Sequence, residues 1–193
     1  DGVVGGVTPL GAVTVNSATN VTADAAFSAA SFRQVAGSGT TTFTGALATT
    51  AAAGVEVDGT NFDFNSTVNL TLGSLDVDAT GTVRFNGVVT TQAAAAGLVT
   101  ITNGGVLTIT AGGDMNLQGA FLQDGAGTIS TAGDITTTND AITFTDEVTL
   151  TGAVALNSGA AGGTITFKDL LNGTQTLGLT AGTGNIDFDG VVG

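Results

Sequence analysis

The sequence predicts an all-β protein, a right-handed parallel β-helix (β-solenoid) of about nine coils with ~21 residues each. The first observation is a four-residue pattern that ends in Phe and recurs at 40–43, 61–64, 82–85, 141–144, 164–167 and 185–188. Within each copy apolar and polar residues alternate, as they do in a half-buried strand.

The second observation is a spacing of 21 residues. Phe43, Phe64 and Phe85 are each 21 apart, and so are Phe167 and Phe188. A fixed period of this length is typical of a solenoid, in which each coil buries its apolar residues only against neighbouring coils. The third observation excludes helices: the chain has 31 Gly, many β-branched residues and no sustained 3.6-residue apolar spacing.

The coils can be assigned in order along the chain, each with three short strands and three turns. The first joins 185–193 to 6–20, and the others cover 21–39, 40–59, 60–80, 81–104, 105–125, 126–140, 141–162 and 163–184. The coil at 126–140 is shorter than a full turn. Nine coils at a strand spacing of ~4.8 Å would rise about 43 Å.

The recurring Phe residues predict one aromatic stack inside the coils. Its members are Phe43, Phe64, Phe85, Phe144, Phe167 and Phe188, with Ile109 and Ile129 at the same position between them. Rows of Asn and Thr at the turns are expected to hydrogen-bond along the axis. Parallel strands connected in this way wind right-handed. The alternative, a string of small β-sandwiches, predicts strands every 8–12 residues without the longer period.

The composition excludes several kinds of chemistry. The chain has no Cys, His, Trp or Tyr, and its only basic residues are Arg33, Arg84 and Lys168. Thiolate nucleophiles, Cys/His zinc sites and imidazole bases are therefore absent. A net charge of -13 disfavours nucleic acid and anionic membranes as partners. No stretch approaches the ~20 apolar residues of a membrane span, and no signal peptide is visible.

The same five residues open and close the sequence. Asp-Gly-Val-Val-Gly stands at 1–5 and again at 189–193, an offset of 188. We therefore expect residues 1–193 to be a single β-helical segment, one ~188-residue period of a longer array. The array can be a tandem repeat within one polypeptide or a stack of discrete subunits, because an uncapped β-helix exposes strand edges at both ends. The expected partners are further copies of the same repeat.

Several segments resemble the β-strand repeats of filamentous-haemagglutinin-like bacterial surface proteins: "TPLGAVTVNSATNVT" (8–22), "GSGTTTFTGAL" (37–47) and the stretch from 162 to 193. The resemblance covers most of the chain but rests on repeat style, with no catalytic or binding motif. It implies a right-handed β-helical shaft, export to the cell surface or the extracellular space, and a role in adhesion to a host or matrix surface.

Four acidic residues form a candidate metal site. Glu56 and Asp58 alternate with apolar residues in one coil, and Asp76 and Asp78 hold the equivalent positions in the next. Stacking would place the four carboxylates on one outer face, about 5 Å apart between coils and about 7 Å apart along a strand. An oxygen-rich cluster of this kind suits Ca²⁺. The alternative is a solvated acidic face with raised pKa values.

Other polar patterns are explained by structure alone. Asp114 and Asp134, 20 residues apart, are expected to cap turns. The adjacent Asp146 and Glu147 are not expected to act as an acid/base pair, because neighbouring strand residues face opposite sides. Thr-x-Thr pairs, as in ice-binding solenoids, lie on several strands without a constant register and follow from the β-propensity of Thr.

The sequence therefore favours a structural, non-enzymatic segment of an extracellular β-helical filament or adhesin shaft, acting by end-to-end stacking of coils. The alternative is a binding module for a surface glycan or a cation. A carbohydrate-active β-helical enzyme and an ice-binding solenoid are further alternatives that the residue pattern supports less. No cofactor other than Ca²⁺ is suggested.

Overall fold

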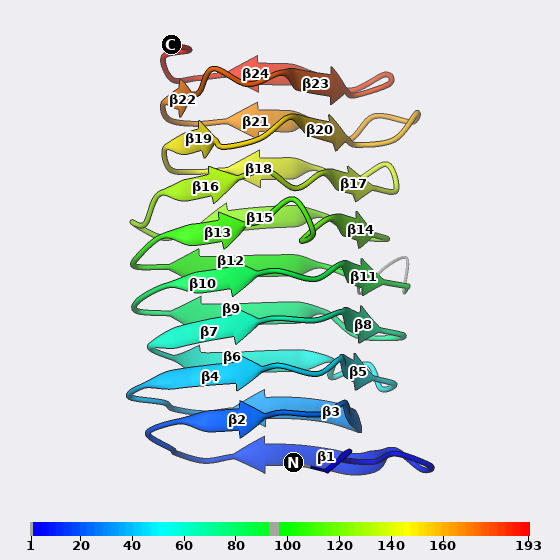
Figure 1. The fold of residues 1–193 in the computed structure, drawn as a ribbon. Helices are drawn as coiled ribbons and strands as arrows, with labels where there is room; N and C mark the ends of the chain where they lie inside the picture. Colours follow the sequence, from blue (N-terminus) through cyan, green and yellow to red (C-terminus); the bar gives the residue numbers. More distant parts are fainter. Residues whose placement is uncertain (1, 93–96) are drawn as a thin grey trace.

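The computed structural model describes residues 2–92 and 97–193, which form a parallel β-solenoid (Figure 1). It has about 8 turns of ~21 residues, close to the nine predicted coils. The described residues hold 24 strands and no helix. The all-β solenoid predicted from the 21-residue period is confirmed.

Each turn has three sides, which we call faces 1, 2 and 3 in the order that the chain visits them. Face 3 is an eight-stranded sheet, whereas faces 1 and 2 belong to one 16-stranded sheet. These two faces are joined because the long strand β3 (Phe27–Gln34) bends from one to the other, pairing with β5 through its first residues and with β6 through its last.

Face 1 holds β5 (Leu47–Thr49), β8 (Val68–Leu70), β11 (Val89–Thr91), β14 (Met115–Leu117), β17 (Ile135–Thr137), β20 (Val154–Asn157) and β23 (Leu177–Thr180). Face 2 holds β1 (Leu10–Val15), β6 (Val55–Gly59), β9 (Leu75–Ala79), β12 (Val99–Asn103), β15 (Phe121–Asp124), β18 (Ile142–Phe144), β21 (Ile165–Phe167) and β24 (Ile186–Phe188). Face 3 holds β2 (Val21–Ala23), β4 (Thr40–Phe43), β7 (Asn61–Phe64), β10 (Val83–Phe85), β13 (Leu107–Ile109), β16 (Ile129–Thr131), β19 (Val148–Leu150) and β22 (Leu171–Asn172).

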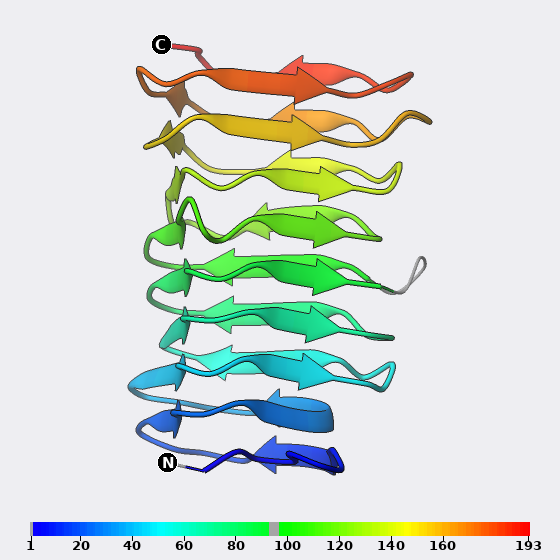
Figure 2. The same ribbon diagram turned by 45° about the vertical axis from the view of Figure 1, so that its right-hand side comes forward.

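The solenoid winds right-handed, as predicted. In Figure 2 the near strands run to the right and the far strands to the left while the chain climbs from N- to C-terminus. All strand pairs are parallel and in register, so each residue lies opposite its counterpart about one turn away: Phe64, for example, is opposite Phe43 and Phe85.

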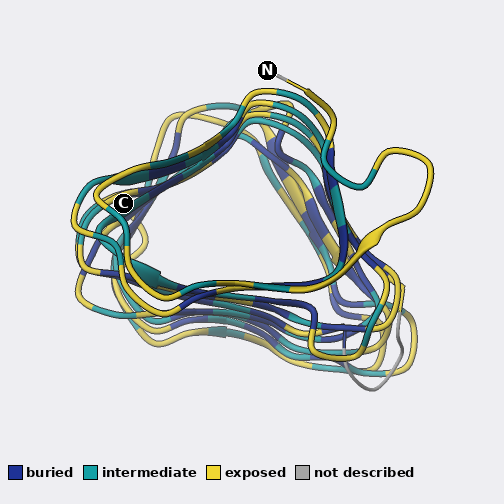
Figure 3. Cartoon of the chain, turned by 90° about the horizontal axis from the view of Figure 1, so that it is seen from below, coloured by how far each residue is buried: buried dark blue, intermediate teal, exposed yellow. Residues whose placement is uncertain are grey.

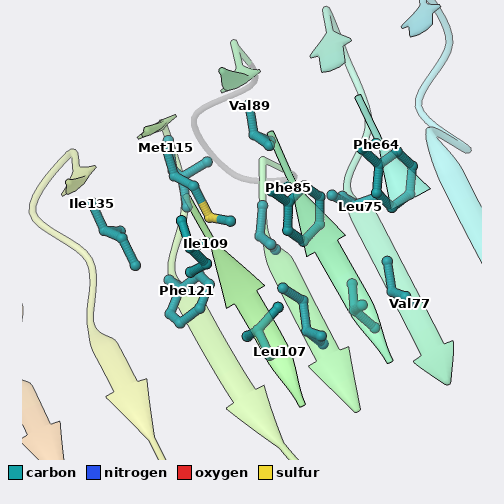
Figure 4. Close-up of a cluster of buried hydrophobic side chains, with 14 of the residues drawn as sticks. Phe64, Leu75, Val77, Phe85, Val89, Leu107, Ile109, Met115, Phe121 and Ile135 are labelled. Atoms are coloured by element: carbon teal, nitrogen blue, oxygen red, sulfur yellow. The ribbon is translucent and has the colours of Figure 1, made fainter. Parts of the chain in front are cut away.

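The core is the interior of a triangular tube (Figure 3). Alternation along each strand sends every second side chain inward, as in β9, where Leu75, Val77 and Ala79 are buried and Asp76 and Asp78 are exposed. Side chains from all three faces meet inside. Figure 4 labels Phe64, Phe85, Leu107 and Ile109 of face 3, Leu75, Val77 and Phe121 of face 2, and Val89, Met115 and Ile135 of face 1.

The single aromatic stack expected from the sequence is wrong, because the structure has two stacks on different faces. Phe43, Phe64 and Phe85 stack on face 3, with ring centroids 5.7 and 4.9 Å apart and rings within 3° of parallel. The second stack lies on face 2 and consists of Phe144, Phe167 and Phe188, at centroid distances of 5.3 and 5.5 Å, and the ring of Phe121 packs against Phe144 at a tilt of 53°.

The aromatic residues change face because the four-residue pattern does not start on the same face in every turn. Ile109 lies opposite Phe85, as expected, but Ile129 lies opposite Leu107, so that Thr131 takes the aromatic position. The predicted coil at 126–140 contains only β16 and β17, two of the three sides of a turn. The next copy of the pattern therefore starts on face 2, which explains why nine coils were counted for about 8 turns.

Candidate functional site

The four predicted carboxylates lie together on the outside of face 2. Strands β6 and β9 pair so that Glu56 is opposite Asp76 and Asp58 is opposite Asp78. The structure thus confirms the stacking that equal coil positions predicted. We call Glu56, Asp58, Asp76 and Asp78 the acidic quartet.

Arg33 extends this row and was missed by the sequence analysis. Its Nε lies 3.0 Å from Oε1 of Glu56, and Arg33 is directly opposite Glu56 in the pairing of β3 with β6. Both side chains are about half exposed, so the ion pair is screened by water and contributes little to stability. The signal was present in the match of "FRQ" (32–34) with "VEV" (55–57).

The pKa values of two members of the acidic quartet are raised from their ordinary value. Burial raises the pKa of Asp58, and the charges of Asp78 and Glu56 raise it further, while Arg33 partly opposes them. Burial also raises the pKa of Asp76, with additional repulsion from Asp78, Glu56 and Asp58. Like charges on neighbouring strands disfavour the ionised form, which agrees with the raised pKa values of an acidic face.

A shallow groove of about 740 Å³ runs beside the quartet, where face 2 turns into face 3. Asp58 and Asp78 line it together with Thr60, Thr80 and Thr102. Its polar groups are hydroxyls and carboxylates that recur from turn to turn. Such a surface can accept hydrogen bonds from a hydroxyl-rich or cationic ligand.

The calcium hypothesis stays a prediction. Within residues 2–92 and 97–193, no group of three or more His, Cys, Asp or Glu side chains is arranged to hold a metal ion. The carboxylates of the acidic quartet are neighbours on a flat strand pair, and the site rests on that adjacency alone.

Polar side chains at the corners connect the turns, as predicted. Oδ1 of Asn61 accepts hydrogen bonds from the backbone N and Oγ1 of Thr82, at 2.9 and 3.0 Å. Asp114 accepts from the backbone N of Asp134 at 2.9 Å, and Asp134 accepts from that of Ala155 at 2.7 Å. Asp114 and Asp134 are therefore turn caps, each satisfying a backbone donor one turn further on.

Three buried amides near the corner between faces 2 and 3 were not anticipated. Gln34, Asn103 and Gln123 are almost fully buried. Oε1 of Gln34 accepts from Thr41 at 2.7 Å, and Nε2 of Gln123 donates to Oδ1 of Asn103 at 2.9 Å. These amides occupy inward positions of the strand alternation, which is the signal by which they could have been found.

Asp146 and Glu147 have different hydrogen-bond partners. Asp146 and Glu147 lie in the turn between β18 and β19 and not within a strand, as the sequence analysis assumed. Oε1 of Glu147 accepts a hydrogen bond from Nδ2 of Asn172 at 3.0 Å, while the backbone N of Asp146 donates to Gln123. Each residue is held by a different neighbouring turn.

The Thr-x-Thr pairs lie on several strands without forming a regular array. On face 3, Thr42 lies opposite Asp63, which in turn lies opposite Arg84. On face 2, Thr100 lies opposite Leu122. Charged and apolar residues thus interrupt both rows, as the sequence predicted.

The two ends of the solenoid are open. Among the described residues, β23 and β24 have no further strand beyond them at one end, where Val192 covers β22, and β1 and β2 have none at the other, where Val4 covers the start of β3. The inward-facing Ile186 and Phe188 of β24 are 40% and 44% exposed, whereas Ile165 and Phe167, one turn below, are 0% and 2% exposed. The core is therefore continuous with an uncovered apolar surface.

Comparison with protein-family models gives no match, and comparisons with curated proteins and with solved structures give no significant match. A search of the described residues for a helix long and apolar enough to cross a membrane finds none. The acidic face and the open ends are the features of the molecule that bear on its function.

Proposed function

We propose that this chain is a structural segment of an extracellular β-helical filament or adhesin shaft. In this proposal the protein is a bacterial surface protein of the filamentous-haemagglutinin-like kind, exported from the cell, and its function is mechanical. Stacked turns would form a stiff rod that spaces or displays other parts toward a host or matrix surface.

The open ends are the observation that carries the proposal. Ile186 and Phe188 lie directly above Ile165 and Phe167, which are buried. One more turn would bury Ile186 and Phe188 in the same way. A Phe side chain buries about 200 Å², so covering Phe188 removes roughly 90 Å² from water and contributes about 2 kcal/mol. A further copy of the same repeat supplies parallel strands for this edge.

The corners between the faces also support a mechanical function. Corner residues such as Asn61 and Asp134 accept hydrogen bonds from the neighbouring turn. Every turn is thus fastened to the next by backbone and side-chain bonds. Solenoids of this type gain their stability from interfaces between neighbouring repeats, which suits a rod of variable length.

Small-angle scattering on polypeptides of one and two copies tests the proposal. We expect the two-copy polypeptide to be a single rod, longer by about 42 Å at an unchanged cross-section. Phe188→Asp in the first copy should break the rod at the junction. Val106→Asp, which changes an exposed residue in the middle of the shaft, is the matched control and should leave its length unchanged. A flexible pair of short rods in the unmutated protein would refute the proposal.

A second candidate function is the binding of a cation or a surface glycan at the acidic face. The groove lined by Asp58 and Asp78 favours it. Calorimetric titration of Ca²⁺ into the chain and into Asp58→Asn/Asp78→Asn is the test. Equal heats from the two proteins would remove the quartet as a calcium site.

A further inference from the structure

We infer that the repeated pentapeptide is a junction, in which one Asp-Gly-Val-Val-Gly strand is both the last strand of one copy and the first strand of the next. The inference rests on the proposed function, because it requires that copies follow one another along the shaft. It also sets the angle between them: each copy is turned by one third of a turn relative to the one before.

At the C-terminal end, the pentapeptide is paired on one side only. Val192 lies opposite Leu171 of face 3. The backbone N of Leu171 donates to the carbonyl of Val191 at 2.9 Å, and the N of Gly193 donates to the carbonyl of Leu171 at 3.1 Å. Both bonds are made by the residues that flank Val192, and they join the pentapeptide to the turn below.

At the N-terminal end, the same pentapeptide is paired on the other side. Val4, which corresponds to Val192, lies opposite Phe27 of face 1. The backbone N of Val4 donates to Ala26 at 2.9 Å, and its carbonyl accepts from Ser28 at 2.9 Å. Here the bonds are made by the N–H and C=O of Val4 itself, and they join the pentapeptide to the turn above.

The two halves complement each other. In a parallel sheet a central residue bonds one neighbouring strand through its own N–H and C=O, and the flanking residues bond the other. Placing Val192 on Val4 assigns the four observed hydrogen bonds to four different backbone groups of one strand. The result is a fully paired central strand with no group used twice.

The corner that leads into the pentapeptide has the same length as the corner that would lie above it in the next copy. Phe188 is four residues before Val192, and Ala23 is four residues before Phe27. In a shared strand, Phe188 of the first copy therefore lies directly below Ala23 of the second. Ala23 is already opposite Phe43 in the present structure. The aromatic stack of face 2 would thus continue into the face 3 stack of the next copy.

This continuation fixes the rotation. Strands β1 to β24, with β3 counted on both of its faces, fill the 25 positions between Val4 on face 1 and Val192 on face 3. Val192 therefore lies 26 strand positions after Val4. With three positions in each turn, this is eight and two-thirds turns. Face 2 of the next copy then lies above face 1, so the acidic quartet moves round the shaft. Three copies return it to the same side after about 125 Å.

The partner chemistry follows from this arrangement. A shaft with its acidic quartets on three sides presents no single charged face, so cations or cationic partners can approach it from every direction. A second copy would be recognised at the junction, through backbone pairing and apolar contact.

Engineered cysteines test the rotation, because the described chain has no cysteine of its own. In a two-copy polypeptide joined through one shared pentapeptide, Asp187→Cys of the first copy is combined with Thr22→Cys of the second. Directly opposed residues lie about 4.8 Å apart, within the range of a disulfide. The competing pair is Asp187→Cys with Thr14→Cys of the second copy, which would meet if β1 stacked on β24 without rotation.

Asp187→Cys with Thr166→Cys of the same copy is the positive control, since these residues are directly opposed in the structure. After oxidation, we expect the intrachain disulfide, seen as a shift in gel mobility and by peptide mass, for the control and for the Thr22 pair. A disulfide in the Thr14 pair, or in neither junction pair while the control forms, overturns the inference. A flexible two-part particle in scattering would instead refute the end-to-end stacking itself.

Discussion

The aromatic stacks give the sharpest test of how the turns are held together. Phe64 is fully buried and stacks on Phe43 and Phe85, whereas Phe188 is 44% exposed and stacks on Phe167 alone. The two residues occupy the same place in the same four-residue pattern. The same substitution at both positions therefore compares a sealed turn with an open one.

Phe64→Ala should lower the free energy of unfolding by about 4 kcal/mol, because it removes a buried ring, leaves a cavity and breaks two stacking contacts. Phe188→Ala should cost about half of that, roughly 2 kcal/mol, since nearly half of the ring is already in water. Equilibrium urea unfolding followed by circular dichroism measures both; the chain has no Trp or Tyr for a fluorescence signal. Equal losses at the two positions would refute the reasoning that the end is open.

Three further predictions follow from polar and charged residues. The pKa values of Asp58 and Asp76 are raised above their ordinary value of 3.8, so the folded chain binds these protons more tightly than the unfolded chain, and both groups lower stability as pH rises from 3.8 through their folded pKa values. Asp58→Asn/Asp76→Asn should therefore raise the urea midpoint at pH 7 and lose that advantage in acid; a midpoint that falls at pH 7 would contradict the pKa directions. Asn61→Ala should cost about 1–2 kcal/mol, because two hydrogen bonds between turns are lost, while Asn116→Ala on the outside of β14 should change the urea midpoint little. With a net charge of -13 over ~42 Å, neighbouring shafts should repel, and millimolar Ca²⁺ should promote bundling in light scattering; identical association in EDTA would disprove this.

The architecture could be predicted because it depends on local patterns. Alternation identified the strands, and the 21-residue interval between Phe43, Phe64 and Phe85 indicated stacked coils. The same logic placed Glu56 opposite Asp76, since equal positions in successive coils become neighbours.

The face on which each strand of the second half of the chain lies could not be predicted in the same way. Phe85 and Phe144 end similar sequence patterns, but they lie on faces 3 and 2. Three sides of similar length accept the same pattern, so a pattern alone does not say which side it occupies. The turn from Ile129 to Val148 has only 19 residues, and its corners decide the face.

The ion pair of Arg33 with Glu56 was missed for a related reason. Strand β3 runs through a corner where the other turns break, which shifts Arg33 from its nominal coil position. Counting residues from the start of each coil gives the wrong neighbour where a strand runs through a corner.

Hydrogen exchange at the open ends tests the central claim most directly. In a single copy, the amides of β24 should exchange much faster than those of β21, because no strand covers β24. In a two-copy polypeptide, β24 of the first copy becomes an interior strand, and its protection should rise to that of β21. Unchanged exchange in β24 would contradict the claim that this fold continues end to end as a shaft.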